Sequence, residues 1–121
     1  MFGKKRAPVP YLVLDPYVTF IESAGGSVVS KNILTGEGTL KWALREGSTN
    51  PIDNGWRFLS DIDDQKWVDN ADNHDIADFN TVANIEPAVL AIYNFPVGAD
   101  LTFVDNGRRF FIDNETGAEV A

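Results

Sequence analysis

The amino-acid sequence predicts an α+β domain with one mainly antiparallel, twisted sheet and one or two helices packed on it. Apolar and polar residues alternate over residues 39–46, which is typical of a half-buried strand. The pair Asn106-Gly107 lies between two β-prone runs and is typical of a tight hairpin turn. Such hairpin signals outnumber any strand-helix-strand alternation, so a parallel α/β sheet is not expected.

The length of 121 residues suits one hydrophobic core, so residues 1–121 are expected to form a single domain. Residues 1–10 combine basic residues with two prolines and are expected to be a loosely ordered N-terminal segment. Residues 11–14 and 18–21 are short β-prone runs on either side of Asp15-Pro16, which indicates a hairpin or one broken strand.

Three strands are predicted next. A brief buried strand over residues 27–30 follows the Gly25-Gly26 turn. The strands at 39–46 and 55–60 flank a polar loop over residues 47–54. Tryptophans on alternating strands are most often core residues, so Trp42 and Trp56 are expected mainly inside.

The second half of the chain has shorter elements. Residues 61–73 are rich in acids and amides and predict a turn, a short helical piece and a loop. Apolar residues recur every three positions and predict one apolar stripe on a short helical or irregular segment, at Ile76, Phe79, Val82 and Ile85. Glu86-Pro87 is expected to begin a helix, and residues 99–113 are expected to form a C-terminal hairpin.

The formal net charge of -8 opposes binding to nucleic-acid phosphates and to anionic membranes, and would attract a basic protein. The chain has no cysteine, which fits a reducing compartment. Charged residues and prolines interrupt the N-terminal region where a secretion signal would be apolar, and no apolar run is long enough to cross a bilayer. We therefore expect a cytoplasmic protein.

The sequence does not favour catalysis. Without cysteine and with His74 as the only histidine, in a polar loop, a nucleophilic triad is not expected. An acidic stretch offers carboxylates that could contact a basic partner or a hard metal ion, at Asp61, Asp63, Asp64, Asp69 and Asp72. Since the spacing lacks the pattern of a calcium-binding loop, a solvated or partner-binding patch is favoured, with neither metal nor cofactor.

Charges also collect at the ends of adjacent predicted strands, at Arg45, Glu46, Asp53 and Arg57. Cross-strand ion pairs among them would fix the loop over residues 47–54. The same cluster could belong to a recognition surface, and both interpretations stay open at this stage.

An ordered set of segments carries a family resemblance: Ser30-Lys31, Ile33-Leu34, Gly38, Trp42, Arg45-Glu46, Asp53-Asn54-Gly55-Trp56-Arg57-Phe58, Ser60-Asp61-Ile62-Asp63-Asp64, Asn80-Thr81-Val82-Ala83-Asn84, Pro87 and Pro96-Val97-Gly98. Residues 29–98 with these segments resemble the immunity protein thirty-three domain of bacterial polymorphic toxin systems. Its motif residues are expected to be structural, namely Trp42, Arg45, Asp53, Gly55, Trp56, Arg57, Phe58, Asn80, Asn84 and Pro87.

The resemblance implies that the protein neutralises a cognate bacterial toxin by direct binding and is not an enzyme. A compact acidic module can block a basic toxin by steering and ion pairing alone. The alternatives are a cytoplasmic scaffold or regulatory module unrelated to toxins, and a carboxylate-based metal-dependent hydrolase that uses the acidic stretch with His74. The sequence does not indicate the oligomeric state.

Overall fold

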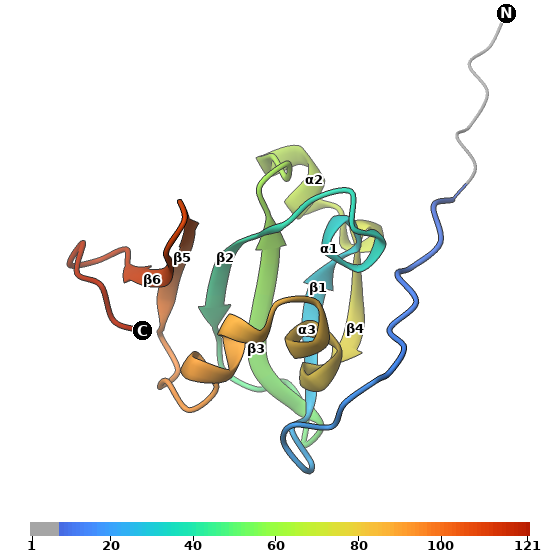
Figure 1. The fold of residues 1–121 in the computed structure, drawn as a ribbon, viewed down its shortest axis with the longest axis horizontal. Coiled ribbons are helices and arrows are strands. Elements are labelled where there is room, and N and C mark those ends of the chain that lie inside the picture. Colours follow the sequence, from blue (N-terminus) through green and yellow to red (C-terminus); the bar gives the residue numbers. More distant parts are fainter. Residues whose placement is uncertain (1–7) are drawn as a thin grey trace, which may run out of the picture.

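A computed structural model describes residues 8–121 and contains a six-stranded sheet with the strand order β4-β1-β3-β2-β5-β6 (Figure 1). Neighbouring strands are antiparallel except β1 and β3, which are parallel. The predicted α+β fold with a mainly antiparallel sheet is thus confirmed. The strands are β1 Gly26–Ser30, β2 Leu40–Arg45, β3 Asp53–Ser60, β4 His74–Asp78, β5 Asp100–Asp105 and β6 Arg109–Asp113.

The helices are short, and side-chain caps fix where they begin. Ser30, Asp64 and Asp78 each accept a hydrogen bond from a backbone N–H of the helix that follows. Pro87 stands in the first turn of a 3-10 helix, where the prediction placed a helix start. The helical elements are α1 Lys31–Thr35, α2 Gln65–Asp69, η1 Ala71–Asn73, α3 Phe79–Ile85 and η2 Pro87–Ile92.

One hydrophobic core lies between the sheet and the elements α1, α3 and η2, and Figure 1 shows α3 in front of β1 and β3. Trp56 and Phe58 of β3 are fully buried, and their rings stack with centroids 5.8 Å apart. Phe79 of α3 packs against Phe58, and Tyr93 contacts the edge of Phe79. Trp56 is therefore inside, as predicted.

The predicted C-terminal hairpin is present as β5 and β6, joined by the three residues 106–108. Gly107 has a φ of 97°, a left-handed conformation that favours glycine in hairpin loops of this length. The last residues return along β6, where the backbone N–H of Phe111 donates to the carbonyl of Ala121. The outer edge of the hairpin is thereby partly covered.

Residues 8–21, called the N-terminal strap below, contain neither helix nor strand, so the β-runs predicted at 11–14 and 18–21 are wrong. Their backbone pairs with side chains of α3 instead of a neighbouring strand. The Asn80 amide oxygen accepts from the N–H groups of Phe20 and Ile21, at 2.8 and 3.0 Å. Asn84 binds both the N–H and the carbonyl of Val18. Of the predicted loose segment 1–10, residues 1–7 lie outside the described residues.

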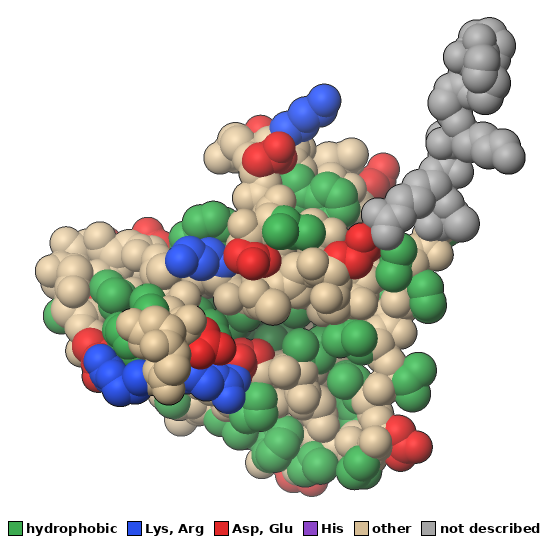
Figure 2. All heavy atoms as spheres, turned by 45° about the horizontal axis from the view of Figure 1, so that its top comes forward, with side chains coloured by type: hydrophobic (Ala, Val, Ile, Leu, Met, Phe, Trp, Pro, Cys, Tyr) green, Lys and Arg blue, Asp and Glu red, His purple; other side chains and the backbone are tan. Residues whose placement is uncertain are grey.

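The strap also turns large apolar side chains outward, at Tyr11, Leu12, Val13, Tyr17, Val18 and Phe20. Figure 2 shows hydrophobic side chains along the right-hand and lower margin, where Figure 1 places this segment. The strap is therefore held mainly through its backbone, with additional bonds from the Tyr11 and Tyr17 hydroxyls to Asp75 and Thr81, and it displays apolar surface.

Two predictions for apolar residues are wrong. Trp42 is only half-buried, because a register shift at the start of β2 and the strand alternation put Ala43 in the core. Ile76 does not share a helical stripe with Phe79, because Asp78 caps α3 just before Phe79 and Ile76 pairs in β4 instead. Both side chains consequently face away from α3.

Within residues 8–121, none of the helices is long and apolar enough to span a membrane.

Candidate functional site

The sheet face opposite the core is called the open face below. Register places on it Val28, Trp42, Leu44, Arg57, Leu59 and Ile76. Four of these apolar side chains are half-buried, while Ile76 is 67% exposed. An apolar sheet face left partly exposed to water is typical of a binding surface.

Two hollows lie on the open face. One of about 280 Å³ is lined by Trp42, Leu44 and Leu59 with residues of α2 and Asp100. The other, of about 490 Å³, is lined by Val28 and Ile76 together with residues 68–75. Val68 lines both hollows, so they adjoin at α2.

Carboxylates border these hollows on several sides, at Asp64, Asp69, Asp75 and Asp100. The first three come from α2, its N-cap and β4, which are close in sequence, whereas Asp100 begins β5, far along the chain. Asp64 also caps α2, and Trp67 of α2 donates its indole N–H to the Ser30 hydroxyl at 3.1 Å. These two bonds hold α2 and its acidic residues at the margin of the sheet.

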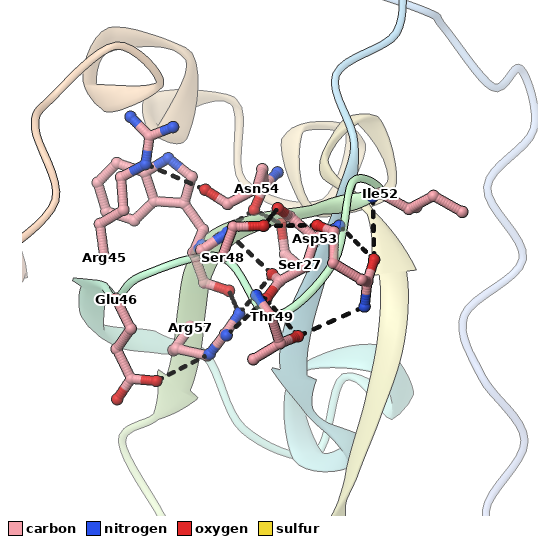
Figure 3. A network of polar contacts seen from close by, with 12 residues as sticks. Ser27, Arg45, Glu46, Ser48, Thr49, Ile52, Asp53, Asn54 and Arg57 are labelled. Carbon is pink, nitrogen blue, oxygen red and sulfur yellow. Dashed lines mark hydrogen bonds and ion pairs between the residues drawn. The ribbon is translucent and has the colours of Figure 1, made fainter.

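A polar network fixes the other end of the open face, in the loop over residues 47–54 (Figure 3). Arg57 donates to both carboxylate oxygens of Asp53, at 2.8 and 2.9 Å, and these side chains are only 13% and 10% exposed. Asp53 also accepts from the backbone N–H groups of Thr49 and Gly55. The Arg57 guanidinium, helped by these N–H groups, holds the pKa of Asp53 well below its usual range.

Gly55 and Arg45 complete this end of the sheet. Gly55 has a φ of 87°, and a Cβ there would lie 2.2 Å from the Glu46 carbonyl oxygen, so only glycine fits. Arg45 donates to the carbonyls of Asn54 and Phe95 and lies 5.8 Å from the Trp56 ring centroid. The predicted strand-end cluster is thus present, with its charges paired or bonded to backbone.

The structure separates the five acids predicted as a contact patch. Asp63 and Asp64 line the smaller hollow and Asp69 lines the larger, but only Asp64 and Asp69 are exposed. Asp63 is 8% exposed and accepts from the Ser60 N–H, the Ser60 hydroxyl and the Asn32 amide, so its oxygens are engaged inside the protein. Asp61 accepts from the N–H of Thr39, and Asp72 lies exposed on η1.

Asp75 and Asp100 were missed by sequence reasoning. Asp75 stands in a polar stretch that did not suggest a strand, and Asp100 precedes the apolar residues of the hairpin. His74 begins β4, and its Nε2 contacts the Val68 carbonyl at 2.9 Å. Within residues 8–121, no three His, Asp or Glu side chains form a group that could hold a metal ion.

The family model described as the Immunity protein Imm33 domain matches residues 27–116. This chain belongs to that family. The resemblance predicted from residues 29–98 is therefore confirmed, and the match extends through the hairpin that the resemblance had left out. No curated protein and no solved structure matched the chain. Immunity is the function that the Imm33 family indicates, and its members are generally not enzymes.

All of the N-terminal strap precedes the Imm33 match, yet Asn80 and Asn84 within the match hold it. Its first part also reaches β4, where the Tyr11 hydroxyl donates to Asp75 at 2.8 Å. Desolvation of the hydroxyl and the neighbouring Asp75 carboxylate raise the pKa of Tyr11 to about 12.

We therefore expect Tyr11 of this Imm33 domain to titrate near pH 12, against about pH 10 for a free tyrosine. The folded state holds this proton more tightly, so the stabilisation is complete below pH 10 and is lost as the pH rises towards 12. Ultraviolet difference titration of the wild type against Tyr11→Phe isolates this residue. A difference curve centred near pH 10 would show that the Asp75 contact is absent in solution.

Proposed function

We propose that this chain is an immunity protein that neutralises a bacterial toxin by binding it directly through the open face. The main observation in support is that this face has an apolar floor, formed by Trp42, Leu44 and Leu59, and a border of carboxylates. The floor supplies area that leaves water on binding, and the border attracts opposite charge from a distance. Membership of the Imm33 family supplies the class of partner. The mechanism requires no reaction on the chain.

The toxin surface that binds there is proposed to be basic. Among the described residues, neither lysine nor arginine lines the two hollows, and Arg57 lies outside both. The ionisable side chains that line them are carboxylates and His74. With a net charge of -8 the whole chain adds to this attraction. Complementary charge of this kind accelerates association and makes it sensitive to salt.

The bacterial cytoplasm is the proposed site of this encounter, as part of a polymorphic toxin system. The cysteine-free sequence suits a reducing compartment. The negative charge makes nucleic acid and anionic membranes unfavourable partners. The proposal thus has a single kind of partner, the toxin domain.

The test is co-expression of this chain with the toxic C-terminal domain encoded beside its gene, followed by host survival and co-purification. Survival with a stable complex supports the proposal, and host death without a complex overturns it. Trp42→Ala is then expected to weaken the complex by at least about tenfold, because truncating a central aromatic side chain removes buried contact area. Its thermal unfolding, compared with that of the wild type, separates lost contact from lost fold.

A charge-reversal pair tests the acidic border. Asp69 is exposed and bonds only with Gln65 one turn away, so Asp69→Lys should leave the fold intact. It is expected to slow association about tenfold at low salt. Asp105→Lys makes the same change in net charge at the far end of β5, in the strand alternation of the buried Leu101 and Phe103, and is expected to have a much smaller effect. Equal effects of both variants would place the contact elsewhere.

A further inference from the structure

Gly26 begins β1, and its backbone conformation is one that any residue could adopt, so it does not explain why glycine stands there. Its φ lies outside the left-handed region that favours glycine. Glycine is a poor strand residue, because it gains nothing from packing and loses the most chain entropy on folding. In strands it often marks a place that another group approaches closely.

Two exposed isoleucines face the space above Gly26. A Cβ on this residue would lie 3.0 Å from Cγ2 of Ile76 and 3.8 Å from Cγ2 of Ile52. Ile76 is 67% exposed and Ile52 is 73% exposed. Hollows of about 370 and 470 Å³ adjoin this pair, and Gly26, Ile52 and Ile76 line both. These hollows therefore form a socket with two apolar walls, and the Ile76 wall lies close over the Gly26 backbone because no side chain stands there.

The wall formed by Ile52 is held in place before any partner arrives. The N–H of Ile52 donates to the Asn50 side chain at 2.9 Å, and its carbonyl accepts from the N–H of Gly26 at 2.9 Å. Figure 3 shows the Ile52 side chain pointing away from the polar network around Asp53. The backbone that carries the Ile52 side chain is thus already ordered, which lowers the entropy cost of binding on this side of the socket.

The charges around the socket select its occupant. Asp53 and Arg57 line one hollow, and each is paired with the other. Asp78 lines the other hollow, where it is exposed and caps α3 through the N–H of Asn80. Among the described lining residues, no basic side chain pairs with Asp78. A long basic side chain has an apolar stem that suits the isoleucines and a cationic end that suits Asp78.

We infer that the socket above Gly26 receives a lysine or arginine side chain of the toxin, with the stem between Ile52 and Ile76 and the cation at Asp78. This inference rests on the proposed function. It adds a contact that anchors the toxin at the edge of the open face formed by β4 and β1.

Gly26→Ala tests the inference because its methyl group enters the socket. The atom that it crowds is the end of an exposed side chain, Ile76, which can turn away. We expect the toxin affinity to fall about tenfold while the thermal unfolding midpoint stays the same or rises. Gly47→Ala is the matched control, since a Cβ there meets nothing within 4 Å. An unchanged affinity for Gly26→Ala, with a wild-type complex formed, overturns the inference and leaves the proposed function standing.

Asp78→Asn tests the charge of the occupant, because asparagine also caps helices and should keep α3 in place. The affinity is expected to fall several-fold and to depend less on salt. If Gly26→Ala weakens binding and Asp78→Asn does not, the occupant is apolar and the inference is wrong. Absence of any wild-type complex would overturn the proposed function, and the inference with it.

Discussion

Replacing Asp53 by asparagine is expected to lower the free energy of unfolding at pH 7 by about 3 kcal/mol. The substitution leaves the largely buried Arg57 with Glu46, whose side chain is 65% exposed, as its remaining ion-pair partner. It also removes charge from an acceptor of the Thr49 and Gly55 N–H groups. Urea unfolding of both proteins measures the loss.

The pH dependence identifies the cause of that loss. Because the pKa of Asp53 is lowered in the folded state, its stabilisation is complete above the unfolded pKa of about 4 and declines as the pH falls further. The wild type should therefore lose stability between about pH 4 and pH 2 more steeply than Asp53→Asn, so that the two curves converge.

Asp72→Asn is the control for removal of one carboxylate, because Asp72 is exposed on η1. Its effect on the free energy of unfolding should stay within about 0.5 kcal/mol at every pH. A difference between Asp53→Asn and the wild type that stayed constant on acidification would contradict the ion pair as the source of stability.

Replacing Asn80 by alanine is expected to cost about 3 kcal/mol and to release the N-terminal strap. Asn80 is 3% exposed, and its amide accepts from two strap N–H groups and donates to the Ile21 carbonyl. Alanine offers neither an acceptor nor a donor. The strap N–H groups would then have to find water or remain unpaired.

Hydrogen exchange distinguishes release of the strap from general loss of stability. In Asn80→Ala the amides of Phe20 and Ile21 should exchange much faster than in the wild type. The exchange of amides in β3 should rise only by the amount that the lower free energy of unfolding predicts. Asn94→Ala is the control, since this asparagine is exposed just after η2. The side chains of Asn80 and Asn84 that bind the strap are called the asparagine clamp here. Unchanged protection of Phe20 in Asn80→Ala would mean that this clamp does not hold the strap in solution.

Local sequence patterns predicted the elements that depend on neighbours in the chain. The alternation in β2 and the Asn106-Gly107 turn of the hairpin carry their own signals, and both elements are present. The parallel pairing of β1 with β3 has no such local signal, because it joins segments separated by all of β2. The strap has a misleading local signal, because its residues are β-prone but their backbone bonds with side chains of the helix α3.

The candidate site was predictable only where its residues are close in sequence. Asp64 and Asp69 were proposed from one acidic stretch, and Asp75 follows closely but was missed because its segment gave no strand signal. Asp100 joins them only through the sheet order. Asp63 belongs to the same stretch but is buried, and its carboxylate accepts hydrogen bonds from three donors of the folded chain, so it is not available to a partner. Residue type alone cannot separate a carboxylate that binds a partner from one that ties a loop to a helix.

The asparagine clamp recognises main-chain atoms, at Val18, Phe20 and Ile21, and ignores the identity of the side chains attached to them. At these positions the attachment does not depend on the side chain, whereas Tyr11 and Tyr17 add side-chain bonds to Asp75 and Thr81 elsewhere in the strap. Val18 and Phe20, whose side chains are exposed, can therefore be replaced by residues other than proline while Asn80 and Asn84 still bind the backbone. The outward surface of the strap can thus be varied at these two positions without loosening its attachment, which protein engineering can exploit.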